Sequence, residues 1–328
     1  MIMSEASVAM IRRSYRRTIL AGILFSLIVF ITCSDEGGDG GPNAGDRKTF
    51  TIAHTALGWS MVYVPGGTFP TKADDSATGT VADACWIGET EVTWELWDAV
   101  RSMASSHGYA FQNSGMKGND GAAGKTGLHP VSMVSWRDAM VFCNALTEWY
   151  NSYNETSYAC AYTYTGLINR DSSDATACDN TVFDSSATGF RLVMKNEWEL
   201  AARWRDDATN SVSGYDDPYF TRGSSASGAT SIYSDAAATG LVAVYAANSG
   251  TSTAEVKSKT ANSLGIYDMS GNVSEWCFDM FSTTITSRVI RGGSWSEVAQ
   301  SVQVGMSVSL ATGAANNHVS FRIAKKAP

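Results

Sequence analysis

Two short blocks near the C-terminal end decide the fold: residues 264–276 read LGIYDMSGNVSEW, and residues 291–295 read RGGSW. Each block joins glycines, which allow tight turns, to a tryptophan that can anchor the turn in a core. Only a folded domain has a use for this combination. After Trp295 the composition changes, because residues 296–319 are mostly small or aliphatic, with Glu297 as the single charged residue and no Phe, Trp or Tyr. The function of that last segment is the main question.

Length and composition indicate a folded, acidic protein. The chain has 328 residues with ten Trp, and its aromatic content of 11% can fill a sizeable core. Its formal net charge is −8 and its pI is near 5.0. Lys and Arg cluster only in the N-terminal segment, so the sequence argues against a nucleic-acid partner.

The N-terminal segment has the pattern of an export signal. Four arginines precede an apolar run over residues 19–31, which is too short to span a bilayer comfortably, and Cys33 follows. Residues 30–33 resemble a bacterial lipobox, so we expect a signal peptide over 1–32 and a lipid on Cys33; a short membrane anchor is the alternative. Arg16 and Arg17 leave the twin-arginine and general secretory routes both open. Residues 33–48 predict a solvated tether that holds the domain off a membrane surface. We expect an exported, lipid-anchored protein at the outer membrane and cell surface.

Strand and helix patterns alternate along the rest of the chain. Residues 50–69 alternate around a Pro-Gly-Gly turn, which is typical of a β-hairpin, and residues 85–92 predict a strand leading into a helix capped by Thr93. Ser135 with Asp138 resembles the capping box of a second helix, and residues 189–205 predict a third. Residues 206–260 favour a loop-dominated insertion on the surface. These elements predict one α+β domain over residues 49–328.

Five cysteines follow Cys33. Cys160 and Cys178 bracket a polar loop that a disulfide could close in an exported protein, and an unbridged pair is the alternative. Cys143 lies on the apolar face of the second predicted helix and Cys277 follows Trp276. We expect both to be buried free thiols.

Eight short motifs occur in an order that resembles the sulfatase-modifying-factor family, which contains the formylglycine-generating enzymes. The resemblance implies a C-type lectin-like fold with short antiparallel strands and two to three helices. One departure is Val193-Met194 in place of the usual Pro-Thr, which removes a helix cap. The motifs are VPGGTF (64–69), ETEVT (89–93), HPVS with VSW (129–136), GFRL (189–192), EWE (197–199), the 264–276 block, RGGSW (291–295) and FR (321–322).

The catalytic residues that the resemblance implies are missing. The family's copper-dependent oxidases need two cysteines shortly after Gly-Gly-Ser, because thiolates hold the soft metal. Those positions are Glu297 and Val302 here, and no cysteine lies beyond Cys277. The family's iron-dependent branch needs clustered histidines, whereas the four in this chain are far apart in sequence: His54, His107, His129 and His318. We therefore expect no enzyme activity and no catalytic cofactor.

The segment after Trp295 resembles the variable proteins of diversity-generating retroelements, in which Gly-Gly-Ser-Trp precedes a diversified stretch that Phe-Arg closes. The resemblance implies a variable region over residues 288–328 that binds variable protein partners or other surface ligands. The alternative is a plain surface loop in an inactive family member. Carried over position by position, the diversified residues are Ser296, Glu297, Val298, Ser301, Met306, Val308, Ser309, Leu310, Asn316, Asn317 and His318.

A structural calcium site is also implied by the resemblance. It would use the carboxylates of Asp268 and Glu275 with the carbonyls of Gly271 and Val273, since calcium takes hard oxygen ligands. The alternative is that Asp268 caps a turn while Glu275 accepts hydrogen bonds from backbone amides.

Overall fold

The computed structural model describes residues 40–328. The expected signal peptide, the expected lipidation site Cys33 and the first part of the expected tether lie outside the described residues. The first strand begins at Arg47, two residues before the expected start of the domain. Among residues 40–328, no helix combines the length and the apolar character needed to cross a membrane.

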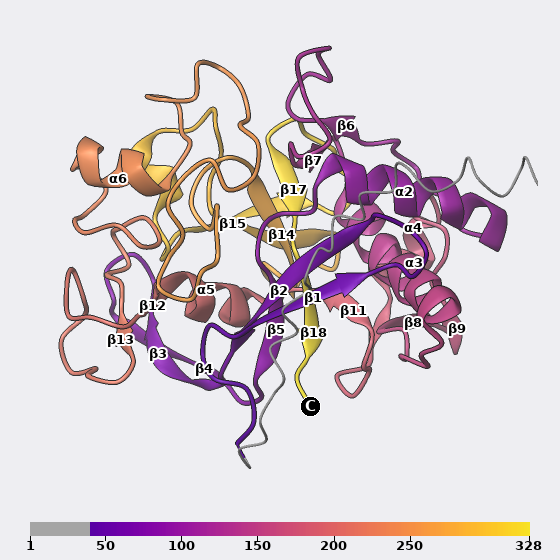
Figure 1. Ribbon diagram of the computed structural model, residues 1–328, viewed down its shortest axis with the longest axis horizontal. Helices are drawn as coiled ribbons and strands as arrows, with labels where there is room; N and C mark the ends of the chain where they lie inside the picture. The colour runs from indigo at the N-terminus through magenta and orange to yellow at the C-terminus, as the bar shows by residue number, and fades with distance from the viewer. Residues whose placement is uncertain (1–39) are drawn as a thin grey trace, which may run out of the picture. The chain divides into compact units, whose positions relative to one another are not determined.

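The main sheet joins the two ends of the domain (Figure 1). Its five strands are antiparallel throughout, and the C-terminal strand lies between strands that come from the first 200 residues. The order is β1 (Arg47–Thr51), β2 (Gly58–Val64), β5 (Cys85–Gly88), β18 (Ile323–Lys326) and β11 (Phe190–Leu192).

A second sheet carries the C-terminal segment. Its order is β16 (Ser307–Ala311), β15 (Ser287–Arg291), β14 (Ser274–Met280) and β17 (Val319–Phe321), with β14 and β17 parallel. The remaining strands form short pairs: β3 (Gly67–Thr71) with β4 (Ala77–Val81), β6 (Met116–Lys117) with β7 (Val131–Ser132), β8 (Tyr162–Tyr164) with β9 (Leu167–Ile168) and β10 (Val182–Phe183), and β12 (Trp204–Arg205) with β13 (Tyr219–Phe220).

The three expected helices are confirmed. Thr93 Oγ1 accepts the Leu96 amide at the start of α2, and Ser135 with Asp138 forms the capping box of α3. At α5 the cap oxygen is missing, as Met194 implies, and the Glu197 carboxylate accepts the Met194 amide instead, at 2.9 Å. The helices are α2 (Trp94–Ala104), α3 (Trp136–Asn154), α4 (Ala175–Asp179), α5 (Lys195–Arg203) and α6 (Ala236–Val242), with short 3₁₀ turns η1 (Ser105–His107) and η2 (Ala299–Val302).

The main sheet separates two hydrophobic clusters. Met61 and Trp86 belong to the cluster under α2 and α3, while the next residue of each strand, Val62 and Ile87, belongs to the cluster under α5. Because successive side chains of a strand point to opposite faces, both faces of the sheet are covered. The resulting α+β architecture with short antiparallel strands agrees with the sequence expectation.

The segment 206–260 is more than the surface loop we expected. It contains the short helix α6, and Ala226, Val242 and Tyr245 form a third apolar cluster with Val302. This cluster places part of the insertion directly beneath the C-terminal segment.

Of the two alternatives for Cys160 and Cys178, the structure has the unbridged pair. Both are free thiols that contact different backbone carbonyls, Cys160 that of Asn144 and Cys178 that of Asp171. Cys143 and Cys277 are buried free thiols, in agreement with the sequence interpretation.

Candidate ligand-binding face

The eleven positions carried over from the resemblance lie on the loop after Trp295, on η2, in the turn before β16, on the edge strand β16 and on the loop before β17. We term this part of the surface the C-terminal face. On β16, Val308 and Leu310 lie on one side of the strand and Ser309 on the other. None of the eleven is buried: Ser296, Val298, Val308 and Ser309 are exposed, and the other seven are intermediate. Val298 is 62% exposed and Val308 is 47% exposed, whereas Val302 and Val304 of the same segment are completely buried.

Two glycine turns hold the backbone beneath this face. Gly293 has φ +68°, and a Cβ there would lie 2.6 Å from the carbonyl oxygen of Ser301. Gly271 has φ +79°, and a Cβ there would lie 2.2 Å from the carbonyl oxygen of Val244. Real Cβ atoms do not approach carbonyl oxygens so closely, so both close contacts require glycine.

Hydrogen bonds from the 264–276 block fix the same backbone. Asn272 is buried, and its backbone carbonyl oxygen accepts a hydrogen bond from the Trp295 amide at 2.8 Å. This bond joins the two blocks that decide the fold directly. Two further bonds reach positions of the C-terminal segment: Ser270 Oγ donates to the Val302 carbonyl at 2.7 Å, and the Ser274 amide donates to the His318 carbonyl at 2.9 Å.

A buried ion network supports strand β15 from below. Arg291 Nη2 lies 2.7 Å from Glu199 Oε2, and Arg203 Nη2 lies 2.8 Å from Glu199 Oε1. Arg291 also donates to the carbonyl of Met306, so the network links α5 to the turn before β16. A buried network whose groups are paired holds its elements in one arrangement.

The C-terminal face contains a small hollow of about 40 Å³. Glu297, Met306 and Val308 line it together with the Gly292-Gly293 turn. Arg291 and three serines also line it, so its wall mixes charged, polar and aliphatic side chains. Its small volume suits contact with a partner's side chain better than enclosure of a whole small molecule.

The sequence analysis missed Ser307 as a member of this surface. Ser307 is exposed and lines the hollow, and it lies on the same side of β16 as Ser309. The alternation of side chains along a strand would have identified it once residues 307–311 were recognised as a strand.

The described residues do not provide the paired cysteines that copper binding by the family's oxidases would need. At the two positions where the resemblance implies cysteines, Glu297 lines the hollow and Val302 is buried in the third cluster. Cys277 is completely buried, and burial raises its pKa well above the ordinary thiol value, so it is unreactive. Within residues 40–328, no group of three or more His, Cys, Asp or Glu side chains is placed to hold a metal ion.

The two carboxylates expected to bind calcium have other partners. Glu275 is completely buried and its two oxygens accept bonds from Arg322 Nη2 at 2.5 Å and Nε at 2.6 Å. Asp268 accepts the Lys257 amide at 2.8 Å, and its pKa is raised to about 6, mainly by burial. A guanidinium in contact with both oxygens supplies the positive charge that calcium would bring, so this donor set fits an arginine rather than calcium.

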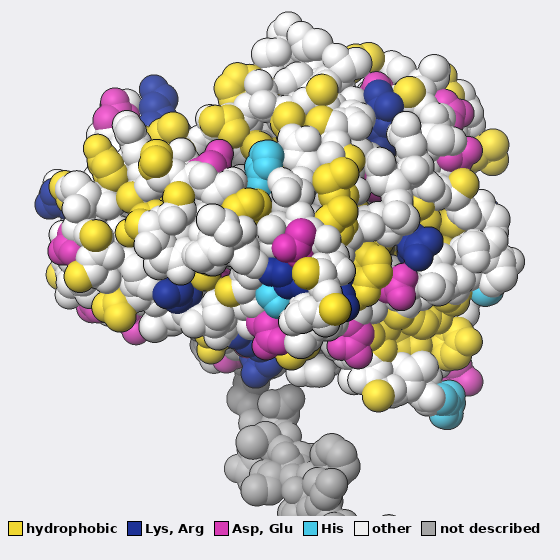
Figure 2. Space-filling model, turned by 90° about the horizontal axis from the view of Figure 1, so that it is seen from above, with side chains coloured by type: hydrophobic (Ala, Val, Ile, Leu, Met, Phe, Trp, Pro, Cys, Tyr) yellow, Lys and Arg dark blue, Asp and Glu magenta, His cyan; other side chains and the backbone are white. Residues whose placement is uncertain are grey.

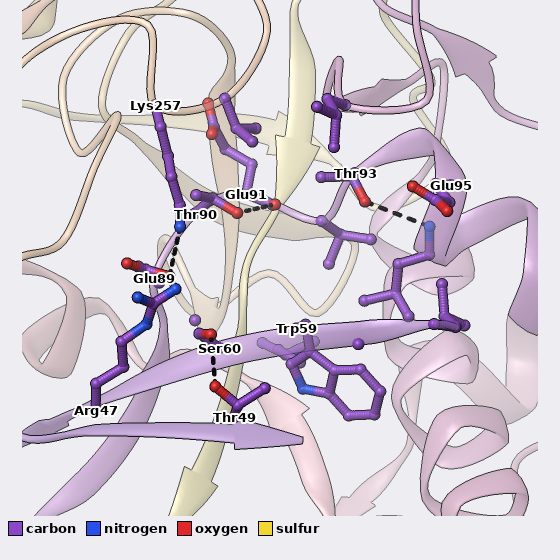
Figure 3. Close-up of a pocket in the computed structure, with 18 of the residues that line it drawn as sticks. Arg47, Thr49, Trp59, Ser60, Glu89, Thr90, Glu91, Thr93, Glu95 and Lys257 are labelled. Carbon is purple, nitrogen blue, oxygen red and sulfur yellow. Dashed lines mark hydrogen bonds and ion pairs between the residues drawn. The ribbon is translucent and has the colours of Figure 1, made fainter. Parts of the chain in front are cut away.

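A separate cavity of about 400 Å³ lies between β1, β2 and the start of α2 (Figure 3). Arg47 and Lys257 approach Glu89 from different elements, each at 2.7 Å from the carboxylate oxygen Oε2. Trp59 and Leu96 contribute to its apolar wall. Because the two cations share a carboxylate, the charges of this cavity are largely compensated from within.

Comparisons with known proteins bear on both the fold and the C-terminal face. Residues 49–327 match the model of the sulfatase-modifying factor enzyme 1-like domain. "Chaperone protein LppX" of Paenibacillus barcinonensis is 28% identical over 277 residues, which are 80% of this chain and 87% of that protein. The structure of Treponema denticola variable protein 1 has a TM-score of 0.64 and 30% identity, and the match covers 86% of this chain and 99% of that one. The structure of CarF has a TM-score of 0.66 and 28% identity, with coverages of 82% and 98%. The expected C-type lectin-like fold and the resemblance to a variable protein are thereby confirmed.

Proposed function

The chain belongs to the sulfatase-modifying factor enzyme 1-like family, and from this premise we propose that it is a non-catalytic member that binds ligands through the C-terminal face. The observation that carries the proposal is the division within residues 296–318. Side chains at the eleven positions reach solvent, while Val302, Val304 and the backbone bonds from Asn272 and Ser270 hold the segment in place. A surface that must accept many different side chains needs this kind of rigid support.

The chemistry of the face favours a macromolecular ligand, in keeping with the expectation of variable protein partners or other surface ligands. Val298, Val308 and Leu310 offer apolar area among small polar side chains, and Glu297 is the only Asp, Glu, Lys or Arg of the eleven. Figure 2 shows one face of the whole molecule, on which uncharged atoms cover most of the area and several charged side chains gather near the centre. A nearly neutral surface of this kind suits protein contacts, in which charged residues are depleted at the centre.

Two experiments test whether the face is diversified and binds. The genomic locus should contain a near-identical template repeat of the 288–328 region and a reverse transcriptase; their absence would exclude diversification. In a second experiment, the codons for the eleven positions are randomised and the resulting variants are displayed as a library. Folded variants that bind a protein such as lysozyme are then selected. A matched library randomised at buried positions of the same segment, including Val302, Gln303 and Val304, should yield no folded binders.

The same proposal includes display on the cell surface by a lipid on Cys33. Metabolic labelling with palmitate should mark the full chain, and Cys33→Ala should abolish the label and release the protein from the membrane fraction. Label that persists in Cys33→Ala would rule out this anchor. Surface exposure is then measured by protease treatment of intact cells.

A chaperone is the second candidate, favoured by the likeness to LppX over 87% of that protein. The apolar positions of the C-terminal face would then bind unfolded clients rather than one folded ligand. Suppression of the aggregation of a reduced client protein, lost in Val308→Ser with Leu310→Ser, would favour this function. No effect on aggregation at equimolar protein would exclude it.

A further inference from the structure

A third hollow, distinct from the C-terminal face and from the cavity in Figure 3, lies at one end of the main sheet and has a volume of about 520 Å³. We term it the lysine cavity, because β1 and β18 contribute three lysines to it: Lys48, Lys325 and Lys326. None of its lining side chains is Asp or Glu. The other lining residues are Phe50, Trp86, Ser157, Tyr158, Ser186, Thr188, Ala327 and Pro328.

The strand register places Lys48 and Lys325 on one face of the sheet, whereas Lys326 lies on the other. Lys325 pairs with Trp86 on one side and with Phe190 on the other, and directly paired residues of antiparallel strands point to the same face. Helix α3 covers one end of this face, where Tyr150 packs on Phe50 and Phe190. The helix ends at Asn154, and the cavity lies beside the loop that follows it.

No side-chain carboxylate among the lining residues compensates the positive charge of the cavity. Among residues 40–328, neither Lys48 nor Lys325 forms a salt bridge, and Lys326 reaches Asp83 only at 4.0 Å. Lys325 is 8% exposed; its ammonium donates to the Thr188 carbonyl and lies 4.0 Å from the centre of the Tyr158 ring. Burial, and secondarily the charge of Lys48, lower the pKa of Lys325 to about 8.

This arrangement differs from the cavity in Figure 3. There the carboxylate of Glu89 is bonded by both Arg47 and Lys257. In the lysine cavity two neighbouring ammonium groups have only a carbonyl and aromatic rings as partners, so an incoming anion would gain from both charges without displacing a resident carboxylate.

We propose that the lysine cavity binds a small organic anion. Its carboxylate, sulfonate or phosphate group lies between Lys48 and Lys325, and its apolar body lies against Trp86 and Tyr158. The cavity volume falls in the range of roughly 300–1,000 Å³ that is usual for small-molecule sites. The site shares none of the eleven positions of the C-terminal face, so it can bind its ligand whatever that face binds.

The test is a fluorescence titration of the full chain with 8-anilinonaphthalene-1-sulfonate. We expect saturable binding with one probe per chain, and competition by phenyl phosphate but not by benzylamine. Lys48→Met and Lys325→Met should each weaken binding about tenfold, because a hydrogen bond to a charged group contributes roughly 1.5–3 kcal/mol. Lys48 is exposed, so its replacement tests the site without disturbing the core.

Three controls make the result specific. Lys259→Met makes the same charge change outside the cavity, and Val308→Ser alters the C-terminal face; both should leave the affinity unchanged. N-phenyl-1-naphthylamine, which lacks the sulfonate, should bind at least tenfold more weakly. Equal affinity of the neutral probe, or equal loss in Lys48→Met and Lys259→Met, would overturn the proposal.

Discussion

Arg322 and Glu275 form a two-point ion pair that is completely buried, with N–O distances of 2.5 and 2.6 Å. The pair joins the C-terminal Phe-Arg motif to the 264–276 block, two of the motifs on which the family resemblance depends. The remaining Arg322 donors bind the carbonyls of Gly88 and Tyr267, and Trp198 Nε1 donates to Glu275. One arginine therefore fixes both sheets and the turn beneath the C-terminal face.

Arg322→Met should destabilise the protein by about 3–5 kcal/mol, because the substitution leaves the Glu275 carboxylate buried without its partner. Urea unfolding followed by tryptophan fluorescence measures the change. Arg101→Met removes a partly exposed pair with Asp98 and should cost less than about 1 kcal/mol. A similarly small effect in Arg322→Met would show that the buried pair is not needed for the fold.

The effect of a substitution in the C-terminal segment on the free energy of unfolding should depend on whether the side chain is buried. Val298→Ser should change the free energy of unfolding by less than about 0.5 kcal/mol, because the side chain is 62% exposed. Val302→Ser should cost about 2 kcal/mol or more, because it removes buried aliphatic area and buries a hydroxyl. Thermal melts of both variants check this, and equal losses would contradict a rigid support below an adaptable surface.

Stability should rise with pH through the titration of Lys325. Its pKa in the folded protein is about 8, below the ordinary value of 10.5, so between these values the unfolded chain binds more protons and alkali favours folding. Below about pH 8 the buried charge is fully present and its cost is constant. Urea unfolding between pH 8 and 10.5 should show that the free energy of unfolding rises more steeply with pH for the natural chain than for Lys325→Met. Parallel profiles would show that the pKa of Lys325 is not lowered in the folded protein.

The five cysteines of the domain should react as free thiols. After denaturation without reductant, labelling with a thiol-specific dye should detect five free thiols in the domain. In the folded state none should react quickly, because burial raises the pKa of the thiols. Dithiothreitol should leave the melting temperature unchanged. A count of three, with a lower melting temperature after reduction, would restore the bridge between Cys160 and Cys178.

Calcium should not raise the melting temperature, because Arg322 already contacts both oxygens of Glu275. Melts in calcium, magnesium and EDTA should coincide. Stabilisation by calcium alone would show that the ion either binds elsewhere or displaces Arg322 from Glu275. Glu275→Gln distinguishes these two cases, because it abolishes the stabilisation only if calcium binds at Glu275.

Local sequence signals were sufficient for α2, α3 and α5, whereas the short helices α4 and α6 were not predicted. Thr93 and the Ser135–Asp138 box predict two helix starts because capping depends on groups within one turn. The face could be assigned because an ordered set of motifs surrounds it. Ser307 was missed because strand β16, which is short and uncharged, gives little local signal.

The sequence by itself determined the family, the α+β elements and the loss of the oxidase cysteines, because each depends on residue identity or on short spacing. Only the tertiary structure decided that Glu275 binds Arg322, that Cys160 and Cys178 stay apart, and that Lys48 and Lys325 share a cavity. Such relationships join residues far apart in the chain. They depend on how the strands pair and on which charges burial brings together.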